Sequence, residues 1–197
     1  CEIVLGDGEK ILATAAPAGP AFEAASIKCG VRAASGAIET IKITDGQLVI
    51  GTIDDTPAIG ICGSGLVDAC ASLVEVGLLD HSGRFVTDEI AKQVAPTLAD
   101  RLLEREGERV FVLTWSKEVG DLSDCVFLTQ RDVRELQFAK AAIATAAATG
   151  FPPKVLKNSM PFANFSATSF VQATAAIGCP FPNGFPIVTI SGTILCN

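Results

Sequence analysis

Positive charge is scarce in this sequence, which has 15 Lys and Arg residues against 22 Asp and Glu residues. The net charge of −7 and the pI near 4.7 argue against a nucleic-acid or anionic-membrane surface, because both select positive patches. No uninterrupted apolar run reaches the roughly 20 residues that span a bilayer. The start of the chain also lacks a signal-peptide pattern. We therefore expect a cytoplasmic protein with neither a nucleic-acid nor a membrane partner.

Closely spaced metal ligands are missing as well. The seven cysteines are scattered and none forms a C-x-x-C pair, so neither a zinc site nor an iron–sulfur cluster is expected in this chain. Buried, reduced cysteines are the simplest interpretation. Cys62 lies among glycines, so we expect it to be partly exposed and treat it as a candidate reactive thiol. His81 is the only histidine and is predicted to be a surface residue, so no catalytic residue is assigned.

Acidic residues disappear toward the end of the chain. From Ala141 onward there is no Asp or Glu, only Lys154 and Lys157 carry charge, and Phe and Pro accumulate. Such a segment could be an extension covered by a partner, a divergent ending or a stretch translated out of frame, and we favour the last. We therefore predict one domain over residues 1–147 and an atypical Phe- and Pro-rich tail over residues 148–197.

Composition and local patterns predict a mixed α/β domain. Hydrophobic residues make up 49% of the chain, as in a globular protein. Asp-Gly turns between apolar runs predict two hairpins, and helical spacing predicts two helices. Capping-box spacing occurs at Thr97–Asp100, before Leu102 and Leu103, and again at Thr129–Asp132. The expected strands cover about 3–5, 10–15, 37–43, 47–50, 110–114 and 125–128, and the expected helices cover about 66–76 and 130–144.

A glycine-rich segment precedes the first predicted helix and is the most suggestive local motif. It reads Gly60-Ile61-Cys62-Gly63-Ser64-Gly65. Glycines let a backbone approach a ligand closely, and the amides at a helix N-terminus attract anions. The segment is neither a complete dinucleotide fingerprint nor a P-loop, because no Lys follows the glycines. A tight turn between a strand and a helix explains the same pattern.

Several motifs in a fixed order give a more specific indication. They cover about residues 2–143 and together closely resemble the C-terminal domain of the reductive activators of corrinoid-dependent proteins. That domain belongs to the ASKHA superfamily of acetate and sugar kinases, heat-shock chaperones and actin. The motifs are Glu2–Gly6, Ala18–Glu23, Gly30–Ala33, Ser35–Glu39, Gly60–Asp68, Ser82–Phe85 and Leu128–Gln137 with Ala139 and Lys140.

The resemblance implies an actin-like, ribonuclease H-like fold of two lobes with ATP and Mg²⁺ between them. It also implies that ATP hydrolysis drives an electron from an iron–sulfur cluster onto cob(II)amide. The resulting cob(I)amide readies a corrinoid protein for methyl transfer in anaerobic metabolism. The corrinoid protein is thus the expected partner. The oligomeric state is left open, and a homodimer is one possibility.

By analogy with the superfamily, the glycine-rich segment and one charged helix would line the nucleotide side of the cleft. Ordinary surface charge is the alternative explanation for that helix. The residues expected to bind the cofactor are Gly60, Gly63, Ser64, Gly65, Glu135 and Lys140.

The sequence departs from the family pattern in three ways. The ferredoxin domain with its 2Fe–2S cluster, the Asp-Ile-Gly-Thr phosphate loops and the glycine-rich segment expected after Lys140 are all missing from it. The chain opens at Cys1 without an initiator Met and reads as a fragment that begins inside a strand. We therefore expect no activity from it alone. A non-catalytic module that docks a corrinoid protein and a small-molecule kinase of the superfamily are the alternative functions.

Overall fold

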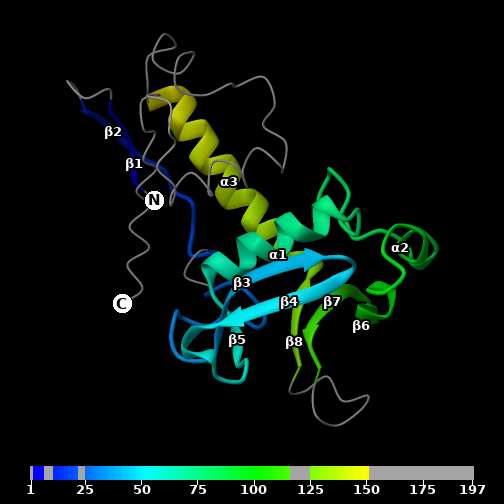
Figure 1. Cartoon of the computed structure of the whole chain (residues 1–197). Helices are drawn as coiled ribbons and strands as arrows, with labels where there is room; N and C mark the ends of the chain where they lie inside the picture. The colour runs from blue at the N-terminus through cyan, green and yellow to red at the C-terminus, as the bar shows by residue number, and fades with distance from the viewer. Residues whose placement is uncertain (1, 7–10, 22–24, 116–124, 151–197) are drawn as a thin grey trace. The chain divides into compact units, whose positions relative to one another are not determined.

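The computed structural model describes residues 2–6, 11–21, 25–115 and 125–150 (Figure 1). They divide into two units, one containing the residues up to Gly19 and those from Phe138 onward, the other spanning Pro20–Gln137. Helix α3 (Gln130–Gly150) begins in the second unit and continues in the first. Most of the predicted tail, from residue 151 on, lies outside the described residues.

The first unit contains the first predicted hairpin. Strands β1 (Glu2–Gly6) and β2 (Ile11–Ala15) pair in antiparallel fashion, with Glu2 opposite Ala15 and Gly6 opposite Ile11. This pairing confirms the hairpin, although its turn falls on residues that the structure does not describe. Residues 16–21 form neither helix nor strand, as their two prolines predict.

The second hairpin opens the larger unit. Strands β3 (Ala37–Thr44) and β4 (Gln47–Thr52) are joined by Asp45 and Gly46, whose φ angles of 52° and 73° are those of a tight hairpin turn. A short strand, β5 (Gly60–Ile61), pairs parallel to β3, so the order is β4-β3-β5. The hairpin was predicted, whereas the two-residue strand β5 was not.

Helix α1 (Gly63–Glu75) runs alongside β3 (Figure 1). Its apolar residues recur at helical spacing, and Leu66 and Leu73 are fully or almost fully buried. The helix ends where Gly77 takes a φ of 78°, with the Leu78 amide donating to the Leu73 carbonyl at 2.9 Å. The predicted helix and its glycine stop are therefore confirmed.

The second sheet of this unit is antiparallel, in the order β6-β7-β8. Its strands are β6 (Leu102–Arg105), β7 (Glu108–Thr114) and β8 (Val126–Thr129). Val110, Val112 and Phe127 of this sheet form a buried cluster with Cys125, which directly precedes β8. The strands predicted at 110–114 and 125–128 are thus confirmed, and β6 is their unpredicted neighbour.

The capping-box spacing at Thr97–Asp100 does not begin an α-helix. Ala99–Arg101 form a single 3-10 turn, and Leu102 then enters β6, where it pairs with Phe111. The Thr97 hydroxyl donates to the Gly46 carbonyl at 2.5 Å instead of capping helix amides. A short helix that was not predicted, α2 (Asp88–Val94), precedes this segment, and a 3-10 turn covers Ile53–Asp55 after β4.

Helix α3 begins at the second capping box, which is confirmed, and ends six residues beyond the predicted Ala144. Its last turns are rich in alanine, the residue with the highest helix propensity, which favours the extension.

The four cysteines of the described residues (Cys29, Cys62, Cys70 and Cys125) are free thiols. The partial exposure expected for Cys62 is wrong, because its side chain is 3% exposed and its thiol donates to the Ile38 carbonyl at 3.2 Å. His81 is exposed, as predicted. Within the described residues, no helix is long and apolar enough to cross a membrane.

Candidate functional site

Two of the four residues of the glycine-rich segment that were predicted to bind the cofactor are needed for packing. A Cβ on Gly60 would lie 2.7 Å from the Cys29 carbonyl, and a Cβ on Gly65 would collide with the Ile38 carbonyl. Both contacts are with backbone atoms, which cannot move aside as a flexible side chain can. The glycines therefore allow β5 and the start of α1 to approach β3 and residues 29–31 closely. This packing agrees with the alternative explanation of the motif, a tight turn between a strand and a helix.

The same segment contains the N-terminus of α1, at which Gly63 and Gly65 are buried. Cys62 is the N-cap residue, and the first turn of α1 contains no acidic residue. The amides of Gly63, Ser64 and Gly65 belong to the first turn, where a helix offers no carbonyl partner for them. Ser64 is exposed at this end, with its hydroxyl 3.3 Å from the Cys62 thiol. In general, the first-turn amides and the positive dipole end of a helix can hold a phosphate or another anion.

Helix α1 is held along β3 by two polar side chains. Asp68 Oδ2 accepts from the Ile41 amide at 3.2 Å, and the Ser72 hydroxyl donates to the Ile41 carbonyl at 3.2 Å. These backbone groups lie on the edge of β3 that continues past the short β5. Burial raises the pKa of Asp68, an effect that the amide hydrogen bond opposes. The pair fixes α1, and with it the glycine-rich N-terminus, against the sheet.

Glu135 and Lys140 both lie on α3, as predicted, and both are half-buried. Burial lowers the pKa of Lys140. The residues are five positions apart, so their side chains leave the helix about 140° apart around its axis. Glu135 belongs to the same unit as the glycine-rich segment and Lys140 to the other unit. Their meeting around one ligand therefore stays a prediction.

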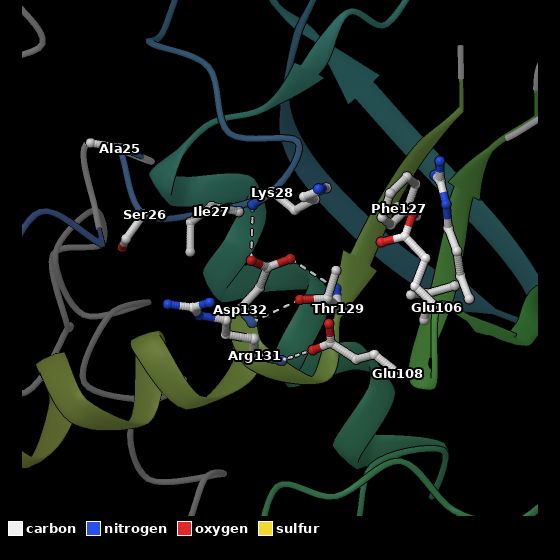
Figure 2. A pocket seen from close by; sticks show the side chains of 12 residues that line it. Ala25, Ser26, Ile27, Lys28, Glu106, Glu108, Phe127, Thr129, Arg131 and Asp132 are labelled. Atoms are coloured by element: carbon white, nitrogen blue, oxygen red, sulfur yellow. Dashed lines mark hydrogen bonds between the residues drawn. The ribbon is translucent and has the colours of Figure 1, made fainter. Parts of the chain in front are cut away.

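A pocket that the sequence did not predict lies at the start of α3 (Figure 2). Its volume is about 390 Å³. It brings together residues 25–28, the turn between β6 and β7, the end of β8 and the first turn of α3. Its lining residues are Ala25, Ser26, Ile27, Lys28, Arg105, Glu106, Glu108, Val110, Phe127, Thr129, Arg131 and Asp132.

Asp132 is the buried charged group of this pocket, with an exposed fraction of 1%. Its carboxylate accepts from the Lys28 amide at 2.9 Å and from the Thr129 amide at 2.8 Å, the dashed contacts of Figure 2. Burial raises the pKa of Asp132, and these hydrogen bonds oppose the shift. The capping box predicted the contact with Thr129, whereas no local signal indicated the contact with Lys28, 104 residues away in sequence.

The remaining charges of the pocket nearly balance. The Arg131 amide donates to Glu108 Oε1 at 2.6 Å, and the Arg105 guanidinium lies 5.0 Å from the centre of the Phe127 ring. With three cationic and three acidic residues in its lining, the pocket favours neither an anion nor a cation. Its clearest role is to join distant segments to the start of α3.

Comparisons with known proteins agree with the resemblance. The family model described as the C-terminal domain of RACo, the ASKHA domain, matches residues 1–151. The corrinoid activation enzyme RamQ of Eubacterium limosum is 35% identical over 144 residues, which are 73% of this chain and 24% of RamQ.

A solved structure, the reductive activator for corrinoid, iron–sulfur protein, is also similar. It has a TM-score of 0.60 and 35% identity, and the match covers 78% of this chain and 24% of that one. The chain therefore spans about a quarter of the length of these relatives. The expected α/β fold and the expected family are both confirmed, and this chain belongs to the family of the C-terminal ASKHA domain of RACo.

Proposed function

We propose that this chain is part of an ATP-dependent reductive activator that returns the cob(II)amide of a corrinoid protein to cob(I)amide. The observation that carries the proposal is the family match over residues 1–151. Two relatives at 35% identity support it, since one is named a corrinoid activation enzyme and the other a reductive activator. Because the chain spans 24% of each relative, the electron-donating 2Fe–2S cluster of the proposal belongs to a ferredoxin domain outside this sequence.

ATP is the nucleotide of this proposal. Gly60, Gly63, Ser64 and Gly65 would lie beside its phosphates, and Glu135 and Lys140 would contact it from α3. The first turn of α1 contains no acidic residue and has an exposed Ser64, which supports an anionic ligand there. Within the described residues, no three His, Cys, Asp or Glu side chains are grouped to hold a metal ion. The proposal has Mg²⁺ arriving on the phosphates of ATP, as it commonly does in such enzymes.

The domain division belongs to the same proposal. Residues 1–147 would form the partial actin-like domain, and residues 148–197 would be a tail read out of frame. The family match, which ends at residue 151, supports a boundary close to residue 147. Reading the gene in all frames across codons 145–150 tests this, because the proposal expects another frame to restore a glycine-rich segment. We further propose that the protein is cytoplasmic and that it prepares the corrinoid protein for methyl transfer. Whether it forms a homodimer is left open.

Titration of MgATP into the full-length protein that the gene encodes tests the nucleotide site. Gly63→Ala adds a methyl group where the phosphates would approach, and Lys140→Ala removes the cation on α3. Each change is expected to raise the dissociation constant for MgATP about tenfold, which corresponds to about 1.4 kcal/mol. Lys92→Ala is the matched control, because Lys92 is an exposed lysine on α2.

The outcomes separate the site from the function. If the wild-type protein binds MgATP and neither Gly63→Ala nor Lys140→Ala weakens binding, the site assignment is wrong while an ATP-dependent function stands. If the wild-type protein binds no MgATP, the proposed function itself is wrong.

A further inference from the structure

A turn between α1 and α2 is shaped by one carboxylate. In this Asp80 turn (residues 80–85), Asp80 Oδ1 accepts from the amides of Ser82 at 2.8 Å and of Arg84 at 2.9 Å. It also accepts from the Ser82 hydroxyl at 2.7 Å. Gly83 has a φ of 75°, which suits glycine better than any other residue. The conformation of the turn is thus set by its own residues.

Both ends of the Asp80 turn are anchored in the core. Leu79 and Phe85 form an antiparallel bridge and are 2% and 7% exposed. Burial of these two side chains ties the turn to the body of the unit. The turn is therefore a fixed point against which another element can be held.

Gln130, at the start of α3, binds this turn with both ends of its amide. Its Nε2 donates to the Gly83 carbonyl at 2.6 Å, and its Oε1 accepts from the Phe85 amide at 3.0 Å. A side-chain amide that both donates and accepts fixes its own orientation as well as its position.

Arg134 and Gln137 bind the same turn one and two helical turns later. Arg134 Nη1 donates to the Ser82 carbonyl at 2.8 Å, and Gln137 Nε2 donates to the same oxygen at 2.9 Å. Arg134 Nη1 also lies 2.6 Å from Gln137 Oε1, so the two side chains support each other. Two lone pairs let one carbonyl accept both bonds.

The three side chains share one face of α3. Gln130, Arg134 and Gln137 follow the spacing of four and three residues that places side chains in line along a helix. One face of the first two turns is thus tied to a fixed turn. This contact joins two separate motifs of the sequence, Ser82–Phe85 and Leu128–Gln137.

We propose that Arg134 and Gln137 are positioning residues for the nucleotide site. Their hydrogen bonds to Ser82 set the rotation of the first turns of α3 about the helix axis, and therefore the direction in which Glu135, in the same unit, leaves the helix. This inference rests on the proposed function, because it assumes that α3 contacts ATP.

A small rotation of the helix is enough to matter. A helix with its side chains has a radius of about 5–6 Å, so a rotation of about 20° moves a surface group by roughly 2 Å. Binding groups must be held to within about 0.5 Å and 10–20° of their productive geometry. Loss of the contact with the Asp80 turn would therefore weaken binding of ATP even though neither Arg134 nor Gln137 touches it.

The test is a MgATP titration of the full-length protein with changes on this face of α3. Arg134→Ala and Gln137→Ala are each expected to raise the dissociation constant about tenfold, an ordinary coupling between two sites. Arg134→Lys keeps a donor and a positive charge and is expected to restore most of the affinity. Arg131→Ala is the control, since it removes a guanidinium from the same helix that does not bind the Asp80 turn, and it should leave the affinity unchanged.

The possible results separate the inference from the proposed function. If wild-type protein binds MgATP and both alanine variants bind equally well, positioning is overturned, even if both variants unfold more easily. Equal weakening by Arg131→Ala would overturn it too, because the effect would then be one of charge. If the wild-type protein binds no MgATP, the proposed function fails and this inference falls with it. Gln137→Ala leaves the hydrogen bond from Arg134 to the Ser82 carbonyl in place. This variant therefore tests the inference if Arg134→Ala does not fold.

Discussion

Thr129 and Asp132 cap each other across the first turn of α3. The Thr129 amide donates to Asp132 Oδ2 at 2.8 Å, and the Asp132 amide donates to the Thr129 hydroxyl at 3.0 Å. The other carboxylate oxygen of Asp132 accepts from the Lys28 amide. One buried side chain therefore both starts the helix and ties residues 25–28 to it.

Replacing Asp132 by Ala should destabilise the domain. The change leaves the buried Thr129 amide and the partly buried Lys28 amide without their acceptor. We expect the free energy of unfolding to fall by about 3 kcal/mol, since each unsatisfied donor costs roughly 1–3 kcal/mol. Urea unfolding followed by circular dichroism measures it. Asp100→Ala is the control, because Asp100 is exposed. A loss as small as that of Asp100→Ala would show that the hydrogen bonds of the Asp132 carboxylate to Lys28 and Thr129 contribute nothing to stability.

Gly65→Ala should destabilise the domain far more than Ser64→Ala, although the two positions are neighbours in α1. The added methyl group at residue 65 would meet the Ile38 carbonyl, whereas Ser64 is exposed. Overpacking of this kind costs about 1–3 kcal/mol or more, and exposed substitutions usually change stability by less than about 0.5 kcal/mol. Thermal unfolding of both variants measures the difference. Equal stability would mean that α1 does not pack against β3 as closely as described.

Local patterns predicted elements whose hydrogen bonds are themselves local. The box at Thr129 predicted α3 because Asp132 lies three residues away and reciprocates the contact. The same spacing at Thr97 does not begin a helix, because the Thr97 hydroxyl donates to the carbonyl of Gly46, 51 residues away in sequence. The short strand β5 escaped prediction for a similar reason, since two residues carry no periodicity and the strand is defined by its pairing with β3 and by the bridge from Ile61 to Gly30.

The candidate site shows the same limit. The glycine pattern correctly predicted a helix start, but it could not reveal that Gly60 and Gly65 face the backbone carbonyls of Cys29 and Ile38, which are distant in sequence. Nor could it reveal that Cys62 is buried, because burial depends on what packs over the turn. The pocket around Asp132 joins segments about 100 residues apart, a contact that no sequence window contains.

Acid should loosen the Asp80 turn. The amide of Arg84, and then the hydroxyl and amide of Ser82, hold the pKa of Asp80 below its ordinary value. A carboxyl whose folded pKa is depressed stabilises the fold above its unfolded pKa, and this contribution is lost as the pH falls through the folded pKa. We therefore expect wild-type protein to be more stable than Asp80→Asn at neutral pH, with the difference shrinking below about pH 4.

Unfolding of wild type and Asp80→Asn in parallel between pH 2 and pH 7 measures this difference. Comparing the two proteins removes the contribution of the other carboxyls. A difference that stayed constant over the whole range would contradict the account, because the charge of Asp80 would then play no part in the turn.

The buried thiols should resist modification in the folded protein. Cys62 and Cys70 are buried, and burial raises the pKa of Cys70 to about 12, so almost no reactive thiolate forms at that residue near neutral pH. Alkylation with iodoacetamide, followed by peptide mass mapping, is expected to label both residues after unfolding and neither before it. Rapid labelling of Cys62 in the folded protein would contradict this prediction and would show that Cys62 is a reactive thiol.

The central claim is that this domain serves an ATP-dependent reductive activator. The most direct measurement mixes the full-length protein with a corrinoid protein in its cob(II)amide state and a reductant, and follows the absorption spectrum under anaerobic conditions. The account predicts that cob(I)amide forms when MgATP is present and does not form when it is omitted or replaced by a non-hydrolysable analogue. Formation of cob(I)amide at the same rate without MgATP, or none with it, would contradict the account.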